Sequence, residues 1–381
     1  MFKFCNFAVD IVVRAISHSG PNGLPRPAGR PAKLLGRCAV ATTTPLLQPN
    51  HLAGHDPFVA ADVGGTHVRI GLVQESDDPA HPVAVLQYRK YVCAQYPGLA
   101  EILEDFIGSL AGAGVTRGVI ASAGYCLEDG TVITANLPWR LSPGEIRARL
   151  GFSDFRLVND FEAVAHAAAY VDASEVLRLT GPEIAPVAGP TLVLGPGTGL
   201  GAAVWIPTGE RAVVMATEAG QAALTPGNAL EMALLAEMLK DRSHVPVEYA
   251  LSGPGLMNLH RALCALRGTQ NPYRSPGEIT TAAMSGSDAL ARESLDAFCG
   301  LLGSAVGDMV LYYGVQGGVY LAGGILPQIR EFLINSSFVE RFLNKGPMRA
   351  ALERIPVRLV EHGQLGVIGA ANWYLGQRES G

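Results

Sequence analysis

The sequence has few cysteines, and their spacing excludes the common cysteine-based metal sites. None of the six forms a CxxC pair or a cysteine–histidine cluster with metal-ligand spacing. They are Cys5, Cys38, Cys93, Cys126, Cys264 and Cys299. We therefore expect reduced thiols, several of them in the core, in a cytoplasmic protein.

Charge is also scarce. Only 17% of the residues are charged, the net charge is −5, and no basic stripe alternates with aromatic residues. This pattern argues against a nucleic-acid partner. With 48% hydrophobic residues in 381, the chain can form two domains with sizeable cores. Two long uncharged runs, Ile184–Gly209 and Met309–Ile329, are broken by glycine and proline, so we expect buried sheet there and no membrane span.

Acidic residues are nearly absent from the first 55 residues, which contain only Asp10 beside six basic residues. Asp10 and Arg14 interrupt the apolar stretch that a secretory signal requires. An arginine-rich, acid-poor segment also resembles a transit peptide. We expect a disordered extension over residues 1–55 and assign it no function.

Two strand–turn–strand units carry glycine-rich turns. The first has strands at Phe58–Ala61 and His67–Val73 around Asp62-Val-Gly-Gly-Thr66, and the second has strands at Thr191–Leu194 and Ala202–Ile206 around Gly195–Gly201. Glycine lets backbone N–H groups approach a phosphate, although an ordinary hairpin turn also uses it. Asp62 can hold Mg²⁺ through water. The repeat predicts a duplicated domain with two phosphate-binding turns facing each other across a cleft.

Asn159 and Asp160 lie where the apolar strand Phe155–Val158 meets a helix expected over Phe161–Tyr170. Ligands of open α/β sheets bind at such carboxyl ends of strands. Helix capping by the same residues is the simpler alternative, and the corner alone favours it.

Other polar residues are weaker candidates. Asn136 and Trp139 could line a sugar pocket, but a tryptophan covering a core edge explains the segment equally well. Glu218 and Gln221 follow a predicted strand, and Glu248 precedes the helix start Leu251-Ser-Gly-Pro-Gly255. Most glutamates belong to solvated faces.

Five motifs together resemble those of bacterial glucokinases, in the sugar kinase/Hsp70/actin superfamily. They are Asp62–Thr66, Val158-Asn-Asp-Phe161, Gly195–Gly201, Leu251–Gly255 and Leu321-Ala-Gly-Gly-Ile325. The resemblance covers the chain from about residue 57 to residue 374. It implies an α/β fold with two ribonuclease-H-like (actin-like ATPase) domains flanking a cleft. Residues 56–170 plus 361–381 would form the small domain, and residues 171–360 the large one.

The resemblance also implies the site and its reaction, the ATP-dependent phosphorylation of glucose at O6 with Mg²⁺. Asp160 would be the catalytic base. Sugar would be bound by Asn136, Asn159, Asp160, Glu218, Gln221 and Glu248. ATP would be bound by Ala61, Asp62, Val63, Gly64, Gly65, Thr66, Gly195, Gly197, Thr198, Gly199, Gly323 and Gly324. The family often forms homodimers.

Gln221 departs from the family pattern, because these glucokinases usually have histidine there. A kinase for another hexose, such as mannose, N-acetylglucosamine or fructose, is therefore an alternative. A sugar-binding regulator with weak turnover is a second alternative. The sequence contains no evident helix-turn-helix and retains Asp160, so the kinase is the leading hypothesis.

Overall fold

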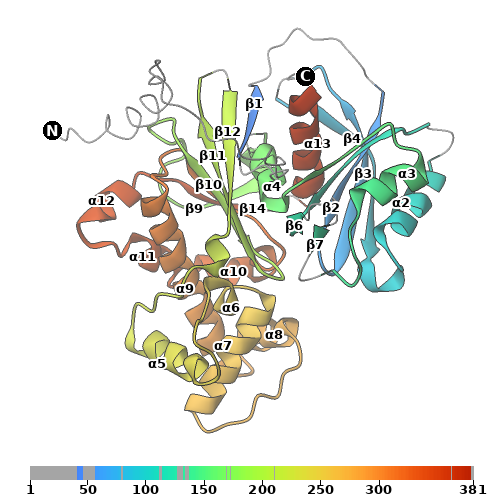
Figure 1. Cartoon of the computed structure of the whole chain (residues 1–381). Helices are drawn as coiled ribbons and strands as arrows, with labels where there is room; N and C mark the ends of the chain where they lie inside the picture. The colour runs from blue at the N-terminus through green and yellow to red at the C-terminus, as the bar shows by residue number, and fades with distance from the viewer. Residues whose placement is uncertain are drawn as a thin grey trace, which may run out of the picture. The chain divides into compact units, whose positions relative to one another are not determined.

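Two hairpins with glycine turns form the centres of the two main sheets in this computed structural model (Figure 1). One pairs β2 (Phe58–Val63) with β3 (His67–Glu75), and the other pairs β10 (Thr191–Pro196) with β11 (Leu200–Pro207). The sequence predicts both, and the pairing confirms them. The structure describes residues 41–45, 56–78, 80–110, 114–126, 132–133, 137–168, 170–171, 173–209, 211–361 and 363–378, all within the unit Arg37–Gly381.

The turns are shorter than predicted. Asp62 still pairs with Arg69 in the ladder, so β2 continues to Val63 and the first turn is only Gly64–Thr66. In the same way β10 continues to Pro196, which leaves Gly197–Gly199 as the second turn. Backbone pairing extends each strand because it satisfies N–H and C=O groups that a longer turn would leave unpaired.

The first sheet has the strand order β4-β3-β2-β5-β8. Strands β4, β3 and β2 are antiparallel, and β2, β5 and β8 are parallel. Its further elements are β4 (Val83–Val92), α2 (Leu99–Gly108), β5 (Arg117–Ser122), α3 (Pro143–Leu150) and β8 (Asp154–Val158), beside the short pair β6 (Tyr125–Cys126) and β7 (Val132–Ile133). On β3 the predicted apolar face is confirmed, because Val68, Ile70 and Leu72 are all buried.

The second sheet has the order β1-β12-β11-β10-β13-β14-β9 among the described residues. Its central five strands repeat the pairing of the first sheet: β12, β11 and β10 are antiparallel, and β10, β13 and β14 are parallel. The remaining bounds are β1 (Ala41–Pro45), β9 (Val176–Thr180), β12 (Arg211–Thr217), β13 (Gly318–Leu321) and β14 (Val357–Val360). The same strand order twice is what a duplicated unit produces.

Strand β1 lies inside the segment that the sequence analysis expects to be disordered. Its residues Ala41–Pro45 pair antiparallel with Arg211–Met215 of β12, so the expectation of disorder does not hold for these five residues. An extended segment can add to the exposed edge of a sheet through backbone bonds alone. Residues 1–40 and 46–55 lie outside the described residues.

Helices α4 (Asp160–Ala168) and α13 (Leu365–Arg378) connect the two sheets. Apolar residues of α13 pack on β2 and β5 of the first sheet, and Ala165 and Ala168 of α4 pack on β10 and β11 of the second. The two helices meet where a Cβ at Gly369 would collide with the Ala163 carbonyl group. Trp373 Nε1 also donates to the buried Glu162 carboxylate at 2.9 Å. The carboxyl end of β8 is therefore fixed between both sheets.

Helices fill the rest of the second half. They are α5 (Ala229–Met238), α6 (Val247–Ala250), α7 (Gly253–Leu266), α8 (Pro276–Ser285), α9 (Ala289–Tyr312), α10 (Arg330–Ile334), α11 (Phe338–Leu343) and α12 (Arg349–Leu352). Ser252 caps α7 as predicted, because its Oγ accepts from Gly255 N at 2.9 Å. In the part of the chain that is described, α9 alone has the length and hydropathy of a candidate membrane span, and 78% of that apolar window is buried within the protein.

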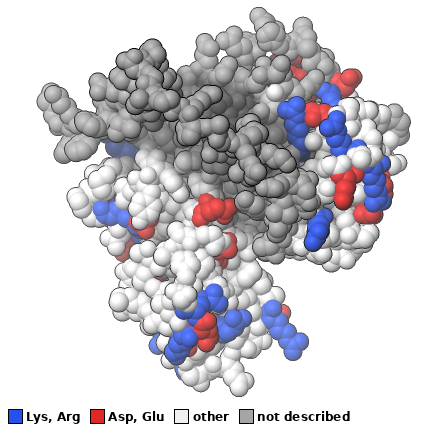
Figure 2. Space-filling model, viewed as in Figure 1, with Lys and Arg blue, Asp and Glu red and all other residues white. Residues whose placement is uncertain are grey.

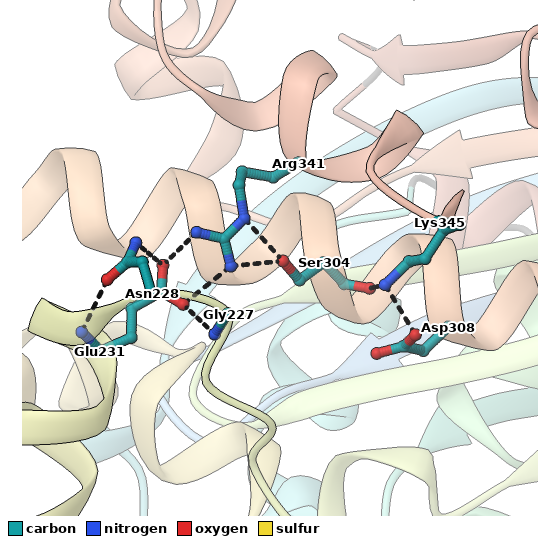
Figure 3. A network of polar contacts seen from close by, with 7 residues as sticks. All are labelled: Gly227, Asn228, Glu231, Ser304, Asp308, Arg341 and Lys345. Atoms are coloured by element: carbon teal, nitrogen blue, oxygen red, sulfur yellow. Dashed lines mark hydrogen bonds and ion pairs between the residues drawn. The ribbon is translucent and has the colours of Figure 1, made fainter. Parts of the chain in front are cut away.

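A buried ion pair joins α11 to the start of α5 (Figure 3). Arg341 donates two hydrogen bonds of 2.8 Å to the Glu231 carboxylate and further bonds to Ser304 Oγ on α9. Glu231 also accepts from Gly227 N, and Asn228 caps the helix through Glu231 N. Because every polar atom of the pair has a partner, the buried charges are compensated.

On the surface, the face in Figure 2 shows basic and acidic side chains interspersed over the described residues. Arg149 forms an exposed ion pair with Glu101, and Arg89 forms one with Asp105. Surface pairs of this type contribute about 0–1 kcal/mol each.

Candidate active site

Asn159 caps α4, as the simpler interpretation of the corner predicts. Its Oδ1 accepts from the backbone N–H groups of Phe161 at 3.0 Å and Glu162 at 3.1 Å. The cap occupies only the carboxamide oxygen, and within the described part of the chain the carboxamide nitrogen has no acceptor. Capping therefore leaves a donor that can reach a ligand.

Asp160 is the first residue of α4, and its environment favours the protonated form more than water does. Burial raises the pKa of Asp160 to about 6, and the negative charges of Asp62 and Glu218 add to the rise. The hydrogen bond from Phe161 N to Asp160 Oδ1, 2.9 Å long, acts in the opposite direction. A carboxylate with a pKa near 6 is ionised at neutral pH and accepts a proton more readily than an ordinary aspartate.

Asp62 lies at the carboxyl-terminal part of β2 and pairs with Arg69 across the hairpin. Arg69 Nη1 donates to Asp62 Oδ2 at 3.0 Å. Burial raises the pKa of Asp62, and the charge and hydrogen bond of Arg69 oppose that rise. Asp62 thus lies within electrostatic reach of Asp160, with its own charge partly balanced by Arg69.

The described residues contain no cluster of three or more His, Cys, Asp or Glu side chains that could hold a metal ion alone. Mg²⁺ usually binds through one or two carboxylates, water and substrate phosphates. Asp62 fits this type of binding as a single protein carboxylate. The buried contact of Cys264 Sγ with His260 Nε2, at 3.4 Å, belongs to the core, because His260 also contacts Ser294 Oγ.

The first glycine turn is held from β3 and from the residue after β4. Gly64 N donates to His67 O at 3.1 Å, and Cys93 N donates to Thr66 O at 3.0 Å. The Cys93 thiol donates to Gly64 O at 3.2 Å. Among the predicted ATP-binding residues, Ala61, Asp62 and Val63 end β2, and Gly64, Gly65 and Thr66 form the turn.

The second glycine turn lies beside two other predicted motifs. Gly197 N donates to Gly199 O at 2.8 Å within the turn, and Gly253 N at the start of α7 donates to Gly197 O at 2.8 Å. Ala322, just before Gly323-Gly324, bonds through its N–H to Leu194 O at 2.8 Å. The structure therefore brings the turn with Thr198, the α7 start and the Gly323-Gly324 motif together.

Phe161 positions the start of α4 against β11, just after the second turn. Its ring lies directly over Gly201, where a Cβ would collide with the ring atoms. Since Phe161 follows Asp160, this contact fixes the base candidate next to β11.

Three predicted sugar residues, Glu218, Gln221 and Glu248, lie in the second half of the chain. Gln221 Nε2 donates to Glu248 Oε1 at 2.8 Å, and Leu200 N of β11 donates to Glu248 Oε2 at 3.3 Å. Glu218 precedes the 3₁₀ turn Ala219–Gln221, and its charge raises the pKa of Asp160. The structure thus joins Gln221 and Glu248 beside the end of the second turn, and it places Glu218 within electrostatic reach of Asp160.

Two contributors were missed by the sequence analysis. His244 Nε2 lies 3.0 Å from the Gln221 carbonyl oxygen, which accepts its hydrogen bond. The Leu200 N–H group is the second, because a backbone donor gives no signal in the residue type. Asn136 lies outside the described residues. Trp139 packs against the core of the first sheet, in line with the core-edge alternative.

The chain has a mixed α/β fold with two sheets, and solved sugar kinases share this fold. A solved ROK family glucokinase from Streptomyces griseus has this fold, with a TM-score of 0.55, 21% identity, and coverage of 83% of this chain and 98% of that one. The family model described as Glucokinase matches residues 59–377. The chain belongs to the glucokinase family.

Individual relatives agree with this assignment. A "Glucokinase-like protein" of Xylella fastidiosa is 57% identical over 84% of this chain and 95% of its own length. The glucokinase of Saccharophagus degradans is 35% identical over 83% of this chain and 98% of its own length. The crystal structure of a glucokinase from an Antarctic psychrotroph has a TM-score of 0.73 at 33% identity. The match covers 84% of this chain and 98% of that one. The resemblance predicted from the motifs is confirmed.

Proposed function

We propose that this protein transfers the γ-phosphoryl group of ATP to the 6-hydroxyl of glucose. The supporting observation is the environment of Asp160, because burial and the charges of Asp62 and Glu218 raise its pKa to about 6. We further propose two ribonuclease-H-like domains around a cleft, residues 56–170 with 361–381 and residues 171–360. The repeated strand order supports this division.

Asp160 performs the proton transfer in this reaction. Its carboxylate accepts the proton of the sugar 6-hydroxyl as the oxygen attacks the γ-phosphorus in line. The bond between the γ-phosphorus and the bridging oxygen breaks, and ADP leaves with that electron pair. Hydrogen bonding by the 64–66 and 197–199 turns orients the phosphates, and positioning of this type supplies most of the rate enhancement.

Mg²⁺, bound to the phosphates and held by Asp62 through water, would neutralise phosphate charge. Asp62 would give the ion one protein carboxylate. Arg69 Nη1 lies 3.0 Å from Asp62 Oδ2 and balances part of its charge.

The sugar is held by hydrogen bonds to its hydroxyl groups. Asn159 donates through its carboxamide nitrogen, and Glu218 and Glu248 accept. Gln221 orients the Glu248 carboxylate. Asn136 is proposed as a further sugar contact from the resemblance alone.

Another hexose is the second candidate substrate, and Gln221 motivates it. Glutamine and histidine both form hydrogen bonds, but they differ in shape and reach. A hexose panel assayed through ADP release decides between the sugars, since a better rate with another hexose would favour the alternative. A sugar-binding regulator would bind glucose with negligible release of ADP.

The base assignment is tested with Asp160→Asn, which keeps the size of the side chain and an oxygen for the Phe161 N–H group. We expect kcat to fall by about 100-fold or more while glucose binding persists. Asp78→Asn, in an exposed loop, is the matched control and should retain wild-type turnover. An unchanged rate for Asp160→Asn would refute the base, and absence of ADP release with every hexose would refute the kinase.

Location and assembly are part of the proposal. We propose a cytoplasmic enzyme that acts on glucose and ATP without nucleic acid or membrane. The resemblance allows a homodimer, and analytical ultracentrifugation measures the oligomeric state directly.

A further inference from the structure

The Glu248 side chain connects two parts of the site that the proposed function keeps separate. Its Oε1 accepts from Gln221 Nε2 at 2.8 Å, on the sugar side. Its Oε2 accepts from Leu200 N at 3.3 Å, directly after the Gly197–Gly199 turn. One carboxylate therefore contacts both the group proposed to recognise sugar and the residue that directly follows the turn proposed to hold phosphate.

The backbones on each side of this link are fixed. The Gln221 carbonyl accepts from His244 Nε2 at 3.0 Å, and Gln221 N donates to Glu218 O at 2.9 Å. Ser252 Oγ donates to the Glu248 carbonyl at 2.7 Å. The carboxylate is consequently the part of the link that can reorient when a ligand arrives.

Room for the carboxylate depends on one glycine of the turn. A Cβ at Gly199 would lie 2.7 Å from Glu248 Oε2, closer than such atoms normally approach. A Cβ at Gly197 would have no atom within 4 Å among the described residues. Two alanine substitutions in one turn therefore differ in whether they displace Glu248 from Leu200.

We propose that Glu248 couples sugar binding to nucleotide binding, so that each ligand strengthens the binding of the other. The proposal rests on the proposed function, because it takes glucose and ATP as the two ligands. A carboxylate next to a phosphate-binding turn repels a polyphosphate, and each hydrogen bond that it accepts reduces this effect. A sugar hydroxyl that donates to Glu248 adds such a bond and holds the carboxylate against Leu200 N.

Thermodynamic linkage makes the effect reciprocal. Sugar lowers the Kd of the nucleotide by some factor, and the nucleotide lowers the Kd of the sugar by the same factor. Ordering of the carboxylate by the first ligand also reduces the entropy that the second ligand must remove.

The test is calorimetric titration of the full chain with AMPPNP and Mg²⁺, with and without saturating glucose. For the wild type we expect glucose to lower the Kd of AMPPNP by about 5-fold or more. Gly197→Ala should show the same ratio, even if its nucleotide affinity changes. Gly199→Ala should bring the ratio close to 1, because its methyl group displaces Glu248 Oε2 from Leu200 N.

Glu248→Gln provides a second measurement that does not depend on the fold of the turn. Without glucose it should bind AMPPNP more tightly than the wild type, because the repelling charge is absent. Equal ratios for Gly199→Ala and the wild type would overturn the coupling, as would weaker AMPPNP binding by Glu248→Gln. If glucose is phosphorylated but leaves the Kd of AMPPNP unchanged, this inference fails alone, whereas a wild type that binds no glucose refutes the proposed function with it.

Discussion

The carboxylates of Asp160 and Asp62 lie within electrostatic reach of each other, one at the start of α4 and the other near the end of β2. Burial raises the pKa of Asp160 to about 6, and the charge of Asp62 contributes to that rise. The pKa of the base candidate in α4 is therefore raised in part by a residue of β2.

Activity should decline in acid because protonated Asp160 cannot accept the proton of the sugar. With a pKa of about 6, we expect kcat/KM to fall about tenfold per pH unit below that value and to level off above it. A pH–rate profile from about pH 4.5 to 8 measures this. A profile that is flat through this range would show that Asp160 is not the titrating base.

Asp160→Asn should stabilise the fold although it should lower turnover. The folded pKa of about 6 lies above the ordinary aspartate pKa of 3.8, so the folded state binds this proton more tightly and stability falls as pH rises through that window. Removing the charge at neutral pH should raise the free energy of unfolding by about 1–3 kcal/mol. Chemical denaturation at about pH 7 and pH 4 measures it; a gain of equal size at both pH values would contradict the explanation.

Gln221 should control sugar affinity more than the chemical step. Gln221→Leu removes the donor to Glu248, and a hydrogen bond to a charged group contributes about 1.5–3 kcal/mol, so the glucose KM should rise about 10- to 100-fold. Gln221→His retains a donor and should lose less. Steady-state kinetics on a hexose panel separates KM from kcat, and an unchanged KM in Gln221→Leu would exclude the role.

Gly369→Ala should destabilise the junction of α4 and α13. The added methyl group meets the Ala163 carbonyl, which belongs to a helical backbone and cannot move without a shift of α4. We expect a loss of about 1–3 kcal/mol or more. Gly108→Ala, at the end of α2 with no atom within 4 Å of its Cβ, is the matched control and should gain up to about 1 kcal/mol. Equal melting temperatures for the two variants would contradict this packing.

Arg341→Met should destabilise the second half of the chain by about 3–5 kcal/mol, because it leaves the Glu231 carboxylate buried without its cation. Adding Glu231→Leu should recover part of the loss. Arg349→Met removes an exposed pair with Glu353 and should cost less than about 1 kcal/mol. Denaturant titration of Arg341→Met, Glu231→Leu and the double variant gives the coupling energy. A double variant as unstable as the sum of both single changes would oppose the explanation.

Much of the local structure could be predicted from the sequence. Ser142 and Glu145 predict the start of α3, where Ser142 Oγ accepts from Glu145 N at 3.4 Å. The apolar stripe from Leu295 to Met309 predicts the core face of α9, which is largely buried. Such signals are local, because capping and amphipathic periodicity depend on neighbours within a turn or two. Strand β1 gave no such signal, since its pairing with β12 uses the backbone.

The features of the site likewise divide into those that the sequence determines and those that depend on the tertiary structure. The sequence by itself determined which residue types are available: the glycines of both turns, Asp160 after a strand, and Gln221 in the place of histidine. Only the tertiary structure decided that Glu248 accepts from Leu200 N and Gln221. It also decided that Phe161 lies over Gly201 and that Asp62 raises the pKa of Asp160. Burial and contacts between distant segments arise only when both sheets and their connecting helices pack together, and no local pattern contains them.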